Sequence, residues 1–192
     1  MPTYAVITAA DRDQVRAALL RTKVGGYLHT GEGPGSAVLF DRPKPRFGRI
    51  SRSRILDPAW ELAGATKAGA WLLEDDGQCA QVTACYPTGG YLSLGWAAEW
   101  TPPEDPARLA AHLRLWRKDC AEIARKTGLS DPDALAEVRN DPAPDGSRIA
   151  GEDILRRICA LVGAPDLVVG QSLFEQAGPR GRDFERFEAR GR

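Results

Sequence analysis

The sequence has no long apolar run and carries no net charge. No stretch approaches the ~20 consecutive apolar residues that a membrane-spanning helix requires, so we expect no membrane partner. Residues 1–14 lack both a basic start and a long apolar stretch, so we do not expect a secretory signal. The formal charge of zero gives no overall electrostatic reason for nucleic-acid or membrane binding.

Cysteine is scarce, and its spacing excludes the common metal patterns. The four cysteines are Cys79, Cys85, Cys120 and Cys159, and none forms a C-x-x-C pair. Cys79 and Cys85 would lie ~20 Å apart on one extended strand, beyond disulfide reach. We therefore expect reduced thiols in a cytoplasm, no metal and no cofactor.

Catalytic motifs are also missing. The chain contains no H-E-x-x-H, G-x-S-x-G or Walker pattern, and the glycine-rich residues 31–36 join two predicted strands as a flexible hairpin tip. His29 precedes this tip, where it could be exposed and titrate, although an incidental strand-end histidine is the preferred interpretation. A Cys85–His29 nucleophile pair requires their two strands to adjoin. The absence of a motif does not exclude an enzyme whose active site assembles from residues dispersed along the sequence.

The centre of the chain, residues 69–100, predicts three antiparallel strands. Strands are expected at 70–74, 79–86 and 91–97, with Asp75-Asp76-Gly77-Gln78 as a hairpin turn. In the second strand, apolar and polar residues alternate, the two-residue period of a strand with one buried face. The residues expected on that buried face are Ala80, Val82, Ala84 and Tyr86.

Helices and further strands flank this sheet. We expect strands at 3–8, 27–30 and 37–40, a helix capped by Asp11, a short helical turn at 57–63, and helices at 105–127 and 152–162. An apolar stripe should place the helix at 105–127 on the sheet; it consists of Leu109, Leu113, Trp116, Cys120 and Ile123. The predicted fold class is α+β, a single domain over residues 1–178 with a mainly antiparallel sheet and two or three helices packed on one face.

The charged tail at 179–192 contains Phe184 and Phe187, which would anchor it to the body if it is ordered.

A basic arm at 41–54 is the most biased segment. Its cations are Arg42, Lys44, Arg46, Arg49, Arg52 and Arg54, against the single acid Asp41. An acidic lobe at 129–153 holds seven acidic residues and two arginines, so it could neutralise the arm within the molecule. Otherwise the arm would bind a partner, a phosphate-bearing ligand or nucleic acid.

The leading functional expectation is a non-catalytic cytoplasmic protein that binds another protein, as an adaptor, inhibitor or immunity-type protein. Arginine and tryptophan are the residue types most often found at binding hot spots. We therefore assign the arm cations as electrostatic contacts and Trp100 as an apolar anchor, while Trp96 is expected in the core. The alternatives are an enzyme or small-molecule binder that holds a phosphate or carboxylate with the arm, and a nucleic-acid-binding protein.

Overall fold

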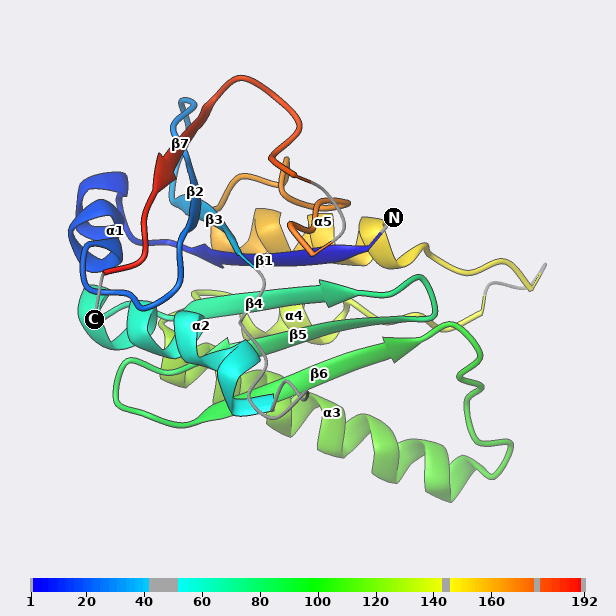
Figure 1. The fold of residues 1–192 in the computed structure, drawn as a ribbon. Coiled ribbons are helices and arrows are strands. Elements are labelled where there is room, and N and C mark those ends of the chain that lie inside the picture. The colour runs from blue at the N-terminus through cyan, green and yellow to red at the C-terminus, as the bar shows by residue number, and fades with distance from the viewer. Residues whose placement is uncertain (1, 42–51, 143–145, 175–176, 191–192) are drawn as a thin grey trace.

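Seven strands form one antiparallel sheet (Figure 1). The computed structural model describes residues 2–41, 52–142, 146–174 and 177–190, and for residues 52–55 it describes the backbone only. The strands are β1 Thr3–Thr8, β2 Gly26–His29, β3 Ser36–Phe40, β4 Ala70–Asp75, β5 Cys79–Cys85, β6 Tyr91–Ala97 and β7 Phe184–Phe187. Their order is β6-β5-β4-β1-β3-β2-β7, and every neighbouring pair is antiparallel. The sheet therefore has two edge strands, β6 and β7.

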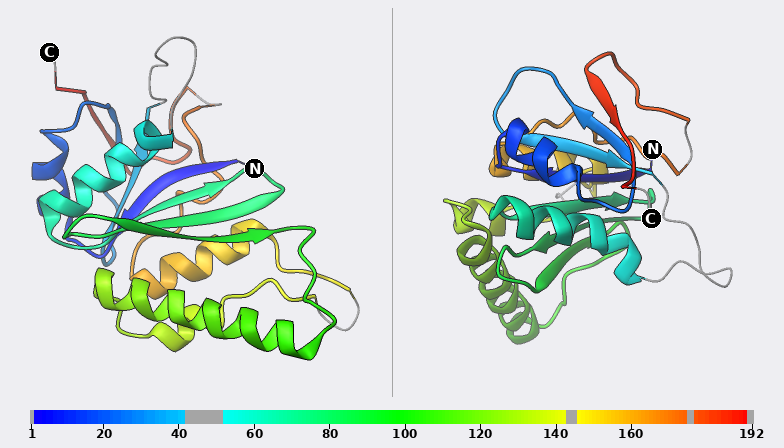
Figure 2. Two further views of the ribbon diagram at one scale, coloured as in Figure 1. Left: turned by 90° about the horizontal axis from the view of Figure 1, so that it is seen from below. Right: turned by 60° about the vertical axis from the view of Figure 1, so that its left-hand side comes forward.

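Helices cover both faces of this sheet. They are α1 Arg12–Leu19, α2 Arg52–Thr66, α3 Pro106–Thr127, α4 Pro132–Ala136 and α5 Gly151–Val162. Figure 2 shows α3, α4 and α5 on one face and α1 with α2 on the other. The expected α+β class and the helices at 105–127 and 152–162 on one face are confirmed, and α1 and α2 add a second layer. None of the helices described combines the length and apolarity needed to cross a membrane.

Two apolar cores result from these two layers. The central strands β1 and β4 are buried along almost their whole length, so alternate residues feed opposite cores. Trp71 and Leu73 pack with α3, α4 and α5, whereas Leu72 packs with α1 and α2. The expected face of β5, with Ala80 and Val82 among its members, points into the first core.

Helix α2 is longer than the predicted turn. We expected Asp57 to cap a helix beginning at Pro58, but Pro58 lies inside a continuous helix. Proline removes one helical hydrogen bond and normally weakens a helix interior. Packing compensates, because Leu56 and Leu62 are buried in the second core, and the turn prediction was wrong for this reason.

The charged C-terminal segment joins the sheet. β7 pairs with β2, and Phe184 and Phe187 pack against the first and second cores respectively. Arg186 donates two hydrogen bonds of 2.8 Å to the Asp41 carboxylate, which places the beginning of the basic arm beside β7.

His29 is buried at 7% exposure, so the exposed, titratable position considered for it is not observed, and it lies at the end of β2. Its imidazole lies edge-on to the Phe184 ring at 5.5 Å between centroids. Strands β4, β1 and β3 separate β2 from β5, so His29 and Cys85 cannot form the nucleophile pair considered above. Burial lowers the pKa of His29, nearby Asp183 raises it and Arg12 lowers it further.

We predict that Leu72→Ala lowers the free energy of unfolding by about 2–5 kcal/mol, because it opens a cavity beneath the central strand. Leu20→Ala is the matched control, since this leucine is 73% exposed and its loss should change stability by less than about 0.5 kcal/mol. Urea denaturation followed by circular dichroism measures both. Equal effects of the two substitutions would contradict the assignment of the core.

The lowered pKa of His29 predicts a pH dependence of stability. Because the folded pKa lies below the unfolded value of 6.5, protons favour the unfolded chain. The stabilising contribution is complete above pH 6.5 and is lost as the pH falls through the folded pKa. Wild type should therefore lose more stability than His29→Gln between about pH 7 and pH 5. Parallel unfolding free energies for the two proteins across this range would contradict the prediction.

Candidate functional site

Most of the predicted basic arm lies outside the described residues. This applies to Arg42, Lys44, Arg46 and Arg49, while Arg52 and Arg54 are described only by their backbone at the beginning of α2. Their role as a binding surface stays a prediction. Trp100 is the predicted site residue whose side chain the structure places, and it lines a cavity.

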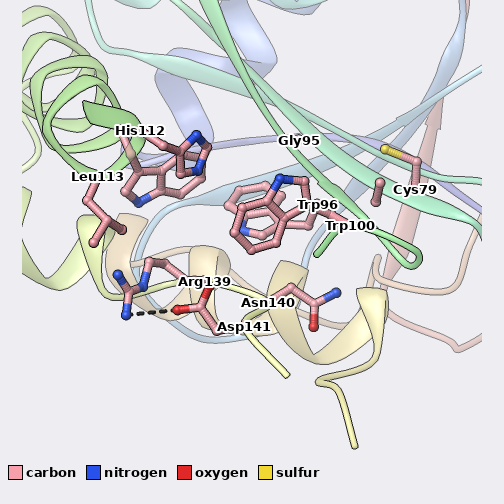
Figure 3. A pocket seen from close by; sticks show the side chains of 11 residues that line it. Cys79, Gly95, Trp96, Trp100, His112, Leu113, Arg139, Asn140 and Asp141 are labelled. Atoms are coloured by element: carbon pink, nitrogen blue, oxygen red, sulfur yellow. Dashed lines mark ion pairs between the residues drawn. The ribbon is translucent and has the colours of Figure 1, made fainter. Parts of the chain in front are cut away.

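This cavity, which we call the tryptophan pocket, has a volume of about 300 Å³. It lies where the end of β6 meets the first half of α3 and the segment that follows α4 (Figure 3). Its lining residues are Cys79, Gly95, Trp96, Ala97, Trp100, His112, Leu113, Trp116, Arg139, Asn140 and Asp141. Three indoles, an imidazole and a leucine make most of this wall apolar.

Two buried or half-buried indoles hold the pocket in place. Trp96 on β6 and Trp116 on α3 meet edge to face, with ring centroids 5.7 Å apart. The Trp96 Nε1–H donates to the Val138 carbonyl at 2.8 Å, and the Trp116 Nε1–H donates to the Ala136 carbonyl at 2.9 Å. Each polar tip is therefore satisfied within the protein, and the expected core position of Trp96 is observed.

The first half of α3 extends past the core instead of lying on it. Cys120 and Ile123 are buried, but Leu113 and Trp116 are only half-buried and line the pocket. The predicted stripe therefore packs on the first core from Trp116 to Ile123, whereas Leu109 and Leu113 are half-buried. His112, one turn before Trp116, stacks against Trp100 with centroids 5.2 Å apart and planes inclined by 30°.

Polar groups are confined to one side of the tryptophan pocket. Arg139 and Asp141 form an ion pair of 2.8 Å, and both side chains are about one-third exposed. Asn140 between them is 7% exposed, and its Oδ1 has no hydrogen-bond partner among the described residues. An unpaired buried acceptor costs about 1–3 kcal/mol, so Asn140 is a position where a bound donor would be stabilising.

A second cavity of about 450 Å³ adjoins the first and shares Cys79, Trp96 and Asn140 with it. Its lining includes Asp75, Glu152 and Asp153 as well as Arg148 and Arg156, so its charge is mixed. Arg156 already pairs with Glu152 at 3.4 Å and with Asp153 at 3.2 Å. The two arginines and three acids leave this lining with a formal charge of −1, which gives a phosphate no net attraction.

The thiols differ in reactivity. Burial raises the pKa of Cys120 and of Cys159 to about 12, which disfavours their thiolates. Cys79 is half-buried on the pocket wall, and its Sγ contacts the Ala80 carbonyl at 3.5 Å. Figure 3 places Cys79 and His112 on opposite sides of the pocket with indole rings between them, so they do not form a nucleophile–base pair.

The acidic side chains of the turn between β4 and β5 accept backbone hydrogen bonds. Across the described ranges, no three His, Cys, Asp or Glu side chains are grouped to hold a metal ion. Asp75 accepts from the Gly77 N–H at 2.8 Å, as the predicted turn requires. The N–H groups of Gln78 and Cys79 hydrogen-bond to Asp76 and lower its pKa, which keeps this turn carboxylate ionised.

No protein-family model, curated protein or solved structure matches this chain. The site must therefore be interpreted from its own residues. The sequence pointed to Trp100 because tryptophan is common at binding hot spots, but it contained no signal that joined Trp100 to His112 or to the Arg139–Asp141 pair.

We predict that Cys79 is the fastest of the four thiols to react with a small disulfide reagent at pH 8. Cys79→Ser should remove the fast phase, and denaturant should make all remaining thiols reactive. The reaction is followed by absorbance. A fast phase that persists in Cys79→Ser would show that another cysteine is the accessible one.

Proposed function

We propose that this protein acts by binding a partner protein, and that the tryptophan pocket receives a large apolar side chain of that partner. The observation that carries the proposal is the open cavity between three indoles and an imidazole. Its volume of about 300 Å³ lies at the small end of ligand-binding pockets. A cavity of this size suits one bulky side chain, the usual anchor of a binding hot spot.

The basic arm complements this pocket in the proposal. Its arginines would supply long-range attraction to an acidic partner, which raises the association rate more than the final affinity. Association rates that do not respond to salt, or to Arg46→Glu with Arg49→Glu, would contradict this role. The proposed location is the cytoplasm, whose reducing conditions would keep the four cysteines as the free thiols found here.

Selection of random 12-residue peptides on the immobilised full chain tests the pocket. We expect the selected peptides to share a large aromatic or aliphatic residue. Trp100→Ala and His112→Ala should each raise the peptide Kd about tenfold or more, because each substitution removes one pocket wall. Leu20→Ala, on the opposite layer, should leave the Kd unchanged, and fluorescence anisotropy measures all four proteins.

Selected peptides that bind Trp100→Ala as tightly as wild type would reject the pocket as the docking site.

The second candidate function is small-molecule binding, which the mainly apolar lining of the cavity favours. Ligand-observed NMR with a fragment collection separates the two. Fragments that bind wild type and not Trp100→Ala, together with a failed peptide selection, would assign the pocket to a small ligand.

A further inference from the structure

The two edges of the sheet differ in how they are protected. β7 is four residues long and carries Glu185 and Arg186, which pair with Arg16 and Asp41 respectively. β6 is seven residues long, and its sequence YLSLGWA contains neither a charged residue nor a proline. Charges, prolines and shortness are the usual features that prevent an edge strand from pairing with another chain. β6 has none of them.

The register shows which backbone groups of β6 face outward. Tyr86 N–H donates to the Gly90 carbonyl and Ala98 N–H donates to the Gln78 carbonyl, so alternate residues between them bond to β5. Leu92, Leu94 and Trp96 are those residues. The N–H and C=O groups of Tyr91, Ser93, Gly95 and Ala97 therefore point away from β5, and all four residues are exposed.

The left-hand view of Figure 2 shows this edge between α2 and α3, with no further strand of the described chain beyond it. The edge also borders the tryptophan pocket. Gly95 and Ala97, whose backbone groups face outward, line the pocket together with Trp96. A strand added beside β6 would therefore run past the mouth of the pocket.

We propose that an extended segment of the partner protein pairs with the free edge of β6 and places one large apolar side chain in the tryptophan pocket. The backbone N–H and C=O groups of Trp96 bond to β5. Toward an added strand, Trp96 therefore occupies a non-hydrogen-bonded position. Opposed side chains lie closest at such positions, with about 4.5–5.5 Å between their Cβ atoms. The partner residue opposite Trp96 projects on the same face as the indole. This inference rests on the proposed function and adds main-chain recognition to it.

A second copy of this chain fits the edge less well. Its own β6 has Leu92, Leu94 and Trp96 on the pocket face, and all three already pack in the first core. Pairing of β6 with β6 would therefore leave the pocket without a side chain to fill it. A strand from a different protein can keep a large side chain free for this position.

The test uses the selected 12-residue peptides, resynthesised with a single N-methyl group at each position in turn. Strand pairing predicts a two-residue period, because alternate N–H groups of the peptide donate to β6 and the others face solvent. N-methylation should raise the Kd about tenfold or more at alternate positions and leave it nearly unchanged between them. A pattern without this period would overturn strand pairing.

Ser93→Pro is the complementary change in the protein. It removes an outward N–H without touching the bonds to β5, which is where an edge strand tolerates proline. Ser93→Ala is the matched control, since both variants lose the 2.8 Å hydroxyl contact with Thr83 and only proline loses the N–H. Ser93→Pro should weaken peptide binding about tenfold or more, and Ser93→Ala should bind as wild type.

The outcomes separate this inference from the proposed function. Binding that is lost in Trp100→Ala but kept in Ser93→Pro, with no N-methyl period, keeps the pocket and rejects strand pairing. Peptides that bind Trp100→Ala and Ser93→Pro as tightly as wild type would reject both proposals. A selection that yields no peptide would also reject both. Dimers that sedimentation detects in wild type and not in Ser93→Pro would assign the edge to a second copy instead. If thermal melting shows that Ser93→Pro is unfolded, the N-methyl pattern decides alone.

Discussion

Two indole hydrogen bonds connect the parts of the molecule that form the pocket. Trp96 belongs to the edge strand and Trp116 to the long helix, yet both donate to carbonyls of one short segment, at Val138 and Ala136. A buried indole N–H without a partner would cost about 1–3 kcal/mol, so these bonds favour a single arrangement of strand, helix and connecting segment. Because both N–H groups are hydrogen-bonded within the protein, the two rings present apolar surface to the cavity that they line.

The first half of α3 borders the cavity. Every residue of α3 before Cys120 is exposed or half-buried, and Leu115 is 56% exposed. Trp100 and His112 stack against each other beside this half of the helix, and both line the cavity. The free edge of β6 and the pocket adjoin because Gly95 and Ala97 of this strand line the cavity.

The proposed binding role draws on three features of the pocket. The apolar wall, the self-neutralised Arg139–Asp141 pair and the separation of Cys79 from His112 suit a site that accepts a shape and a few hydrogen bonds. The charged groups that line the two cavities nearly balance, so neither cavity gives a phosphate a net attraction, and phosphate binding by the basic arm stays a prediction.

Much of the secondary structure could be predicted because its signals are local. The alternation in β5 and the Asp11 cap appear where the residue pattern placed them, and α3 matches the helix expected at 105–127. α2 was underestimated because tertiary packing of Leu56 and Leu62 overrides the propensity of Pro58. β7 was not predicted as a strand, since a four-residue charged segment carries no clear period and depends on its pairing with β2.

The sequence by itself determined the α+β class, the central antiparallel strands and the helices on one face, because periodicity and capping act over a few residues. Only the tertiary structure decided that α1 and α2 bury the opposite face, that His29 is enclosed, and that β6 and β7 are the edges. It also decided that Trp100, His112 and Arg139 surround one cavity. Contacts between distant parts of the chain set the strand order and the positions of the helices on the sheet, and no local sequence pattern encodes either.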